Sequence, residues 1–435
     1  MERVLYGELL KWKARADRKP LIIKGVRQCG KTHIIKEFGE KNYSDYIYLE
    51  FEGDTALSKI FEGDLDPKRI VSAISIKYMK DITKDTLLIF DEIQVCPRAL
   101  TSLKYFCETA PQYHIICAGS LLRLQLPKGT SFPVGKVSFL DLYPMSFREF
   151  LTADGNSRLC AHIDALKRGD RIDESAMYIL EREYRTYCCV GGMPEAVSKW
   201  VETGNMSEVE RIHKEILNSY KLDFLKHVPE EDIKKVNMIW DFLPVQLCRE
   251  NRRFFFGHAV PGSRSKDLED AVQWLIDAAM VHRVCRISRP SIPLSSYAST
   301  NIFKLYMMDI GLFRTAAGIT ADSIMNGSRG SDGFEGGLTE NFVLCELLSA
   351  GHGCMYYWES DNTAEVDFVG LVRDKVVPME VKSGVRVRAA SLAQYIDAYR
   401  PSDAAMISRK NFEEGERTVN IPLYAIWKID EWVRP

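Results

Sequence analysis

The sequence predicts an α/β fold in which helices cover a parallel sheet. Two observations predict it. Short apolar runs that suit buried strands alternate with stretches of helical spacing, an order typical of parallel sheets. The first of these runs, Leu21–Ile23, leads directly into a glycine-rich loop, and apolar residues from Ile34 to Phe38 follow at helical spacing. Strand, glycine loop and helix in this order are typical of a phosphate-binding site at a helix N-terminus.

The glycine loop, Gly25–Thr32, reads GVRQCGKT and fits the pattern GxxxxGK[ST]. Its glycines let backbone N–H groups turn inward around a phosphate, and the helix N-terminus adds partial positive charge. Lys31 would reach the β- and γ-phosphates, and Thr32 would hold Mg²⁺. A chance glycine turn is the alternative, but the flanking strand and helix favour the phosphate loop. The nucleotide contacts that we predict are Gly25, Gln28, Cys29, Gly30, Lys31, Thr32, His33 and, from a later segment, Pro194.

Length and composition restrict the class of protein. At about 150 residues per domain, 435 residues predict two to four domains. The net charge of −2 gives no indication of nucleic acid, so any basic surface must be local. Eleven cysteines without a CxxC pair indicate reduced cytosolic thiols, not a zinc site or a disulfide framework. No apolar run approaches about 18 residues, so we expect a cytoplasmic protein with no membrane partner.

Two carboxylates follow the third predicted strand. Tyr46–Phe51 is the second strand, and Thr86–Phe90 is the third, ending in Asp91 and Glu92. Asp91 would hold Mg²⁺ through water, and Glu92 would polarise the water that attacks the γ-phosphate. A solvated strand end is the alternative. The position of this pair after a phosphate-loop strand favours the catalytic interpretation.

Two further apolar strands complete the predicted sheet. His114–Ala118 is the fourth strand and Val137–Leu142 the fifth, with the stretch Leu100–Glu108 predicted as a helix before the fourth. Ser120, just after the fourth strand, can act as a sensor between the γ-phosphate and the carboxylates, or it can be a turn residue.

These segments resemble a known family. GVRQCGKT, LLIFDEIQ, the strand ending in AGS, and YPMSFREFL are similar to prokaryotic AAA-type ATPases that carry a C-terminal domain of unknown function. The resemblance implies that Gly25–Thr32 binds nucleotide phosphates, that Asp91 and Glu92 serve Mg²⁺ and hydrolysis, and that Ser120 is the sensor.

One position departs from that family. Relatives usually carry Gly-Arg before the last strand, where this chain has Gly135–Lys136. Lysine lacks the planar fork of arginine and is a poor substitute if that arginine assists hydrolysis. Arg123 and Arg148 are candidates for an arginine finger, but the sequence assigns neither.

The middle of the chain, Phe147 to Trp200, is predicted to be helical and contains GGMP, which ends at Pro194. In related ATPases such an element closes over the nucleotide; the alternative is a helix that stops and a second that starts at proline. Helices followed by a hairpin across Asp267–Asp309 predict a winged helix, a DNA-docking module or a rigid spacer. A basic patch suits nucleic acid, although a charged face beside a core strand is equally compatible. The patch comprises Arg249, Arg252, Arg253, Arg264 and Lys266, next to Phe254–Phe256.

A second constellation follows the predicted linker Ser328–Gly337. Alternation along a strand places Glu380 and Lys382 on one face, where Asp367 from the neighbouring strand and Glu340 from a helix can join them. Such carboxylates can hold a divalent metal while the lysine holds or activates water. The segment resembles the PD-(D/E)xK nuclease-like fold, with Glu340, Asp367 and Glu380 as metal ligands and Lys382 catalytic. The alternative is a salt-bridge cluster without catalysis. Arg386 and Arg388 are candidate phosphate contacts.

The predicted architecture is α/β: an AAA-type P-loop ATPase core (1–150), a helical lid (151–235), a winged-helix-like domain (236–327) and a restriction-endonuclease-like domain (328–435). We expect ATP and Mg²⁺ as cofactors, with DNA, a protein or further copies of the chain as candidate partners. The predicted function is an ATPase whose nucleotide state controls a DNA-binding, nuclease-like domain. The alternative is a slow nucleotide switch that binds a protein or DNA partner and has no nuclease activity.

Overall fold

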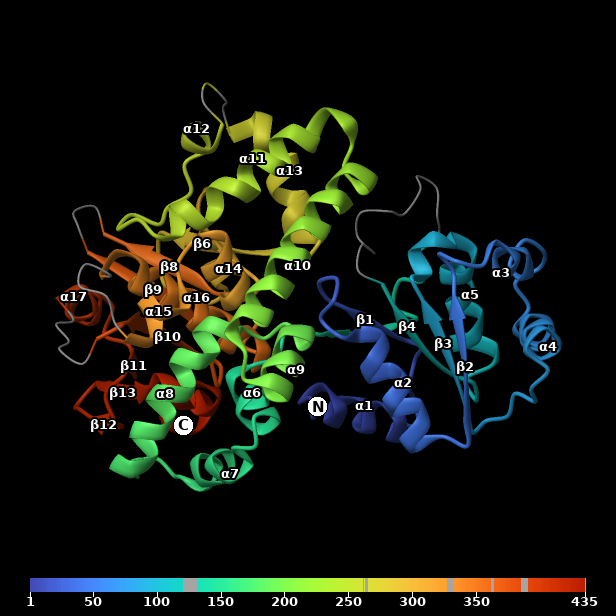
Figure 1. Cartoon of the computed structure of the whole chain (residues 1–435), viewed down its shortest axis with the longest axis horizontal. Helices are drawn as coiled ribbons and strands as arrows, with labels where there is room; N and C mark the ends of the chain where they lie inside the picture. The colour runs from blue at the N-terminus through green and yellow to red at the C-terminus, as the bar shows by residue number, and fades with distance from the viewer. Residues whose placement is uncertain are drawn as a thin grey trace. The chain divides into compact units, whose positions relative to one another are not determined.

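The computed structural model in Figure 1 describes residues 1–119, 132–260, 262, 265–326, 332–360, 364–384 and 390–434. It divides into two compact units. The N-terminal unit consists of residues 2–143 with 277–279, and the C-terminal unit of residue 1 with 144–276 and 280–435. Across the described residues, no helix combines the length and apolar character needed to cross a membrane.

The N-terminal unit contains a five-stranded parallel sheet of order β2-β3-β4-β1-β5. The predicted α/β class and parallel sheet are therefore confirmed. On β1, Ile22 pairs with Cys117 of β4 on one side and with Phe139 of β5 on the other. The strands are β1 (Leu21–Lys24), β2 (Asp45–Glu50), β3 (Thr86–Asp91), β4 (His114–Ala118) and β5 (Ser138–Asp141).

Helices and a packed aromatic core support this sheet. Phe51, Phe61 and Phe90 meet edge to face, with ring centroids 5.7 to 5.9 Å apart. Because Phe90 directly precedes Asp91, this packing fixes the end of β3 that carries the carboxylate pair. The helices are α1 (Leu5–Ala14), α2 (Lys31–Asn42), α3 (Thr55–Ile60), α4 (Pro67–Tyr78), η1 (Ile93–Val95) and α5 (Pro97–Thr109).

The C-terminal unit begins with helices and contains an eight-stranded mixed sheet. Ser146 and Glu149 form a reciprocal capping box that starts the first helix, α6. The helices are α6 (Phe147–Ala153), α7 (Ser157–Ala165), α8 (Glu174–Val190), α9 (Pro194–Thr203), α10 (Met206–His227), α11 (Glu230–Leu247), α12 (Phe256–Ala259), α13 (Ser265–Asp277), η2 (Leu294–Tyr297), α14 (Ile310–Ala316), α15 (Ala321–Asn326), α16 (Asp332–Ser349), α17 (Ala390–Tyr399), η3 (Leu423–Lys428) and α18 (Ile429–Trp432).

The sheet of this unit has the order β12-β13-β11-β10-β9-β8-β6-β7. Its strands are β6 (Val281–Ile287), β7 (Ala298–Met307), β8 (Tyr356–Glu359), β9 (Glu365–Val372), β10 (Lys375–Val381), β11 (Ala404–Ser408), β12 (Glu413–Glu414) and β13 (Thr418–Pro422). A turn at Arg373 and Asp374 joins β9 to β10, whose residues pair in antiparallel register.

The hairpin β6–β7 differs from its predicted place in a separate winged-helix domain. Strand β6 pairs in parallel with β8, with Cys285 opposite Tyr356, so the hairpin extends the C-terminal sheet. Ile287 of the hairpin shares one apolar core with Trp358 and Val369. Pairing also covers the edge that β8 would otherwise expose. The sheet therefore continues across the predicted domain boundary between residues 327 and 328. The predicted linker runs into α16, which begins at Asp332.

Candidate functional site

The glycine loop between β1 and α2 has the backbone that the motif predicts. Gly30 takes a left-handed conformation, φ +92°, immediately before α2. A Cβ on Gly25 would lie 2.2 Å from the backbone oxygen of Leu142, so only glycine fits there. Lys31 is buried, and its Nζ donates hydrogen bonds to the carbonyls of Gly25 (2.9 Å) and Val26 (2.7 Å). These bonds hold the ammonium group against the loop whose N–H groups the motif assigns to phosphate.

A hydrogen-bonded group joins this loop to the end of β3. The hydroxyl of Thr32 donates to Oδ2 of Asp91 at 2.7 Å, as expected if both side chains serve one cation. The phenol of Tyr48, on β2, donates to the same oxygen at 2.7 Å. The N–H of Glu92 donates to Oδ1 at 3.0 Å. Burial, and next the hydrogen bond to Asp91, raise the pKa of Tyr48 well above its usual value.

The residues present fit Mg²⁺. A hydroxyl and a carboxylate oxygen lie in direct contact, and hard oxygen ligands of this kind suit magnesium, which proteins commonly hold with one or two carboxylates and the substrate's phosphates. Thr32 and Asp91 are therefore the residues that would hold the ion. Our sequence analysis did not identify Tyr48. On the adjacent strands Glu50 pairs with Asp91, and Tyr48 lies two residues before Glu50, so Tyr48 is a diagonal neighbour of Asp91. The pairing of these two strands is the signal that could have identified it.

Glu92 is held by a second residue that the sequence missed. Its backbone is left-handed, φ +50°, and the side-chain amide of Gln94 donates a hydrogen bond to Oε2 of Glu92. Gln94 is buried, and none of the residues that the structure describes forms a hydrogen bond with its Oε1. The hydrogen bond that the Gln94 amide donates to this carboxylate fixes the direction in which Glu92 points.

Two predicted nucleotide contacts do not present their side chains to the loop. The thiol of Cys29 is buried, with its Sγ 3.5 Å from the carbonyl of Leu142, so only the backbone of this residue can serve a phosphate. The imidazole of His33 is 76% exposed and lies 3.9 Å from Glu37 on α2. Gln28 is exposed in a left-handed turn, φ +64°.

Three residues considered for hydrolysis remain predictions. Ser120 and Arg123 lie outside the described residues. Arg148 belongs to the C-terminal unit, where it forms an ion pair with Asp164 at 2.7 Å. Lys136, which stands where relatives usually carry arginine, forms an ion pair with Glu108 at 2.9 Å.

The element around Pro194 is a tightly packed helix stop and restart. Gly191 ends α8 with φ +69°, and Pro194 is the first residue of α9. A Cβ on Gly192 would lie 2.1 Å from the carbonyl oxygen of Met145, and the N–H of Met145 donates to Gly192 O at 2.6 Å. Asp309 accepts from Gly192 N at 2.6 Å, and burial raises the pKa of this carboxyl to about 6. These contacts account for the bend, and nucleotide contact by Pro194 stays a prediction.

The C-terminal constellation comes together on β9, β10 and α16. Asp367 accepts a hydrogen bond from the N–H of Val381 at 2.8 Å. Lys382 donates to Oε1 of Glu380 at 2.6 Å, while in the described part of the chain the buried Oε2 of Glu380 has no hydrogen-bond partner. Glu340 is buried on α16 and close enough to Asp367 to affect its pKa. The predicted grouping is thus present.

Two cations that the sequence did not connect with this cluster neutralise it. Arg252 donates to Oε1 of Glu340 at 2.6 Å, and Tyr306 donates to Oε2 at 3.0 Å. Lys304, fully buried on β7, lies 3.9 Å from Oε2 of Glu340 and forms an ion pair with Glu365. The guanidinium of Arg252 is only 13% exposed. The predicted basic patch required Arg252 to be exposed to nucleic acid. In the structure Arg252 is instead a largely buried partner of Glu340.

The charges of this cluster nearly balance without a metal. Its carboxylates are Glu340, Glu365, Asp367 and Glu380, and its cations are Arg252, Lys304 and Lys382, which gives 3 − 4 = −1. Burial, and then Glu340 and Glu380, raise the pKa of Asp367 well above its usual range. Although burial opposes it, Arg252 and Lys304 hold the pKa of Glu340 low.

The predicted metal ligands of the C-terminal unit gain no support from their arrangement. In the part of the chain that the structure describes, no group of three or more His, Cys, Asp or Glu side chains could hold a metal ion. Arg252 and Lys304 lie beside the carboxylate oxygens of Glu340, which we predicted as a metal ligand, and that role stays a prediction.

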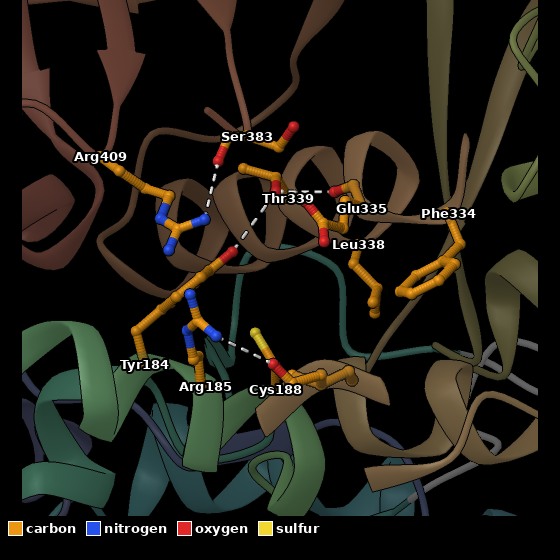
Figure 2. Close-up of a pocket in the computed structure, with 10 residues that line it drawn as sticks. Tyr184, Arg185, Cys188, Phe334, Glu335, Leu338, Thr339, Ser383 and Arg409 are labelled. Atoms are coloured by element: carbon orange, nitrogen blue, oxygen red, sulfur yellow. Dashed lines mark hydrogen bonds between the residues drawn. The ribbon is translucent and has the colours of Figure 1, made fainter. Parts of the chain in front are cut away.

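A pocket lies in the same unit beside α8 and α16 (Figure 2). Its two arginines share one carboxylate: Arg185 Nε and Arg409 Nε donate to Glu181 at 2.8 and 2.9 Å. Tyr184 donates to Thr339, which donates to a backbone carbonyl of its own helix (Figure 2). The polar groups of the lining therefore bind one another. The lining consists of Tyr184, Arg185, Cys188, Ile324, Phe334, Glu335, Leu338, Thr339, Ser383 and Arg409.

Family models match three consecutive parts of the chain. Residues 17–151 match the AAA domain family. Residues 181–323 match a domain of unknown function (DUF8612), and residues 335–426 match another (DUF4143). The AAA match agrees with the glycine loop and the parallel sheet, and it supports ATP binding.

Comparisons with whole proteins add less. No curated protein sequence matches this chain. Among solved structures, a Walker-type ATPase of Pyrococcus abyssi is 13% identical, with TM-score 0.45, covering 72% of this chain and 95% of its own. The Aeropyrum pernix ORC1 protein in complex with DNA is 12% identical, with TM-score 0.31 and coverages of 72% and 90%. DnaA from Aquifex aeolicus is 14% identical, with TM-score 0.27 and coverages of 63% and 86%. Scores this low carry no argument about function.

Proposed function

We propose that this chain binds ATP with Mg²⁺ at the loop Gly25–Thr32 and hydrolyses it slowly, as a nucleotide switch that acts on a protein or DNA partner. The observation that carries the proposal is the contact between Thr32 and Asp91, which joins the end of the glycine loop to the end of β3. A phosphate-binding loop and a carboxylate for a divalent cation are the two parts that nucleotide hydrolysis requires side by side.

Each residue has a stated task. The loop N–H groups and the Lys31 ammonium bind the phosphates, and Thr32 with Asp91 orient the cation. When bound, Mg²⁺ supplies positive charge that stabilises the phosphate oxygens. Glu92 accepts a proton from the attacking water, and the hydrogen bond from Gln94 sets the direction of its carboxylate.

The C-terminal cluster favours the switch over the nuclease. A metal-dependent nuclease needs carboxylates that are open to a cation, whereas Arg252 and Lys304 already pair with Glu340 and Glu365. One observation favours the nuclease: the buried Oε2 of Glu380 has no hydrogen-bond partner among the described residues and could bind a metal ion. We therefore keep the nuclease as the second candidate function.

Two substitutions test the nucleotide site. Lys31→Ala should weaken ATP binding by tenfold or more, at least about 1.4 kcal/mol, in calorimetric titration. Glu92→Gln should bind ATP normally and hydrolyse it at least about a hundredfold more slowly. Lys41→Ala, on the exposed last turn of α2, and Glu62→Gln, which is exposed, are the matched controls. Unchanged affinity in Lys31→Ala would refute the phosphate loop.

A cleavage assay separates the two candidate functions. Linear, nicked and branched DNA are incubated with the full chain and Mg²⁺ or Mn²⁺, with and without ATP. The switch predicts no cleavage under any of these conditions. Cleavage that Asp367→Ala abolishes, while ATP hydrolysis continues, would establish the nuclease instead.

A further inference from the structure

Asp91 receives three hydrogen bonds from three separate parts of the chain. Thr32 on α2 and Tyr48 on β2 both donate to Oδ2 at 2.7 Å. The N–H of Glu92 donates to Oδ1 at 3.0 Å. Both oxygens are thus engaged by neutral donors, and a carboxylate held at both ends has a single orientation. The nucleotide motif accounts for Thr32 and not for Tyr48.

The ring of Tyr48 is itself held in place. The ammonium of Lys36 lies 3.5 Å from the centre of the ring, close enough for a cation–π contact. Lys36 follows Thr32 by four residues, so both side chains leave the same face of α2. Tyr48 pairs in register with Ile89, two residues before Asp91, a diagonal that a long aromatic side chain can span. Helix and sheet together aim the phenol at Asp91.

We propose that Tyr48 is a positioning residue for the cation of the nucleotide site. This inference rests on the proposed function. Its phenol supports the Asp91 oxygen that Thr32 also contacts, and so fixes the carboxylate before a cation arrives. Partners that orient a metal-binding side chain typically contribute a factor of about 10 to 100 to metal affinity or activity. Removal of the phenol oxygen should therefore weaken cation binding without removing any phosphate contact.

The test measures cation binding directly. Mn²⁺ is titrated into the full chain saturated with a non-hydrolysable ATP analogue, and free Mn²⁺ is followed by electron paramagnetic resonance. Tyr48→Phe should bind Mn²⁺ about tenfold more weakly than the wild type. Its affinity for the analogue in the presence of EDTA should stay unchanged, because Lys31 and the loop are untouched. Tyr46→Phe is the matched control, since the Tyr46 phenol on the same strand donates to Glu40 instead.

The possible outcomes separate the inference from its premise. If the wild type binds neither the analogue nor Mn²⁺, the proposed function fails. If the wild type binds both and Tyr48→Phe binds Mn²⁺ equally well, Tyr48 does not position Asp91 and the inference is overturned. Lys36→Met provides a second variant that keeps the phenol but removes the cation over its ring. It should weaken Mn²⁺ binding by a smaller factor, and wild-type Mn²⁺ affinity in both variants would contradict the mechanism.

Discussion

Lys304→Met removes the most deeply buried cation of the C-terminal cluster. The side chain of Lys304 has no exposed surface, and its ammonium serves Glu365 and Glu340. Methionine keeps a similar length and volume, so the main change is the loss of charge. The buried Glu340 and the half-buried Glu365, whose side chain is 35% exposed, then have less compensation, and for Glu340 this is the costly case of a buried charge that loses a partner.

The expected loss follows from this burial. Breaking a buried ion pair by removing one partner costs roughly 3–5 kcal/mol of unfolding free energy. Burial alone would lower the pKa of Lys304, but Tyr306, Glu340 and Glu365 raise it well above 10.5. A cation with a raised pKa contributes its full stabilisation below its unfolded pKa, so the wild type keeps it at pH 6 and at pH 8. In the variant, the stranded carboxyls can take up protons, so the loss should be smaller at pH 6 than at pH 8.

Guanidinium unfolding followed by tryptophan fluorescence measures this loss. Of the seven tryptophans only Trp12 precedes residue 144, so the signal reports mainly on the C-terminal unit. Lys199→Met is the matched control: its side chain is 31% exposed and pairs with Glu202 at 2.6 Å. That exposed pair should contribute less than about 1 kcal/mol. A loss in Lys304→Met no larger than the loss in Lys199→Met would refute the structural role of the cluster.

Two further predictions concern the C-terminal unit. Burial raises the pKa of Glu346 to about 8 from 4.5, so the native protein binds the extra proton between these values and loses stability as the pH rises through them. As the pH rises from 5 to 9, the unfolding free energy of Glu346→Gln should increase relative to that of the wild type by an amount on the order of 5 kcal/mol, as measured by denaturant unfolding. Parallel pH profiles of the two proteins would contradict this. Gly192→Ala should lower the unfolding free energy by about 1–3 kcal/mol, because its Cβ would lie 2.1 Å from Met145 O. Gly257→Ala, whose Cβ would meet no described atom within 4 Å, should change it little, and equal stability of the two variants would show that the bend before Pro194 adapts freely.

The sequence predicted the elements whose signals are local. All five strands of the N-terminal sheet are apolar runs bounded by turns, and each lies within one or two residues of its predicted place. The contact between Thr32 and Asp91 was predictable because the loop motif and the acidic strand end each occupy a fixed place in a parallel sheet. Tyr48 escaped notice because a tyrosine in a strand is ordinary, and its task depends on register with a neighbouring strand.

Long-range partners had no local signal. Arg252 is 88 residues from Glu340 and stood in the sequence as one member of a basic patch. Lys304 is a charged residue within an apolar strand of the hairpin, and its neighbours in the sequence do not indicate its partner. Hydrophobic pattern identified that hairpin but could not say which strand it would pair with, and the pairing of β6 with β8 brings Lys304 within reach of Glu365. Tertiary pairing therefore determined the charge state of the cluster.

The two carboxylate sites differ in the kind of donor that surrounds them. The hydrogen-bond donors to Asp91 are two hydroxyls and a backbone N–H, which orient the carboxylate and leave its negative charge in place. The partners of Glu340 include a guanidinium and an ammonium, which cancel its charge. A cation gains most where the carboxylate is oriented but still charged, and least where protein cations have already neutralised it. Divalent ions should therefore bind at the glycine loop of this chain in preference to the nuclease-like hairpin.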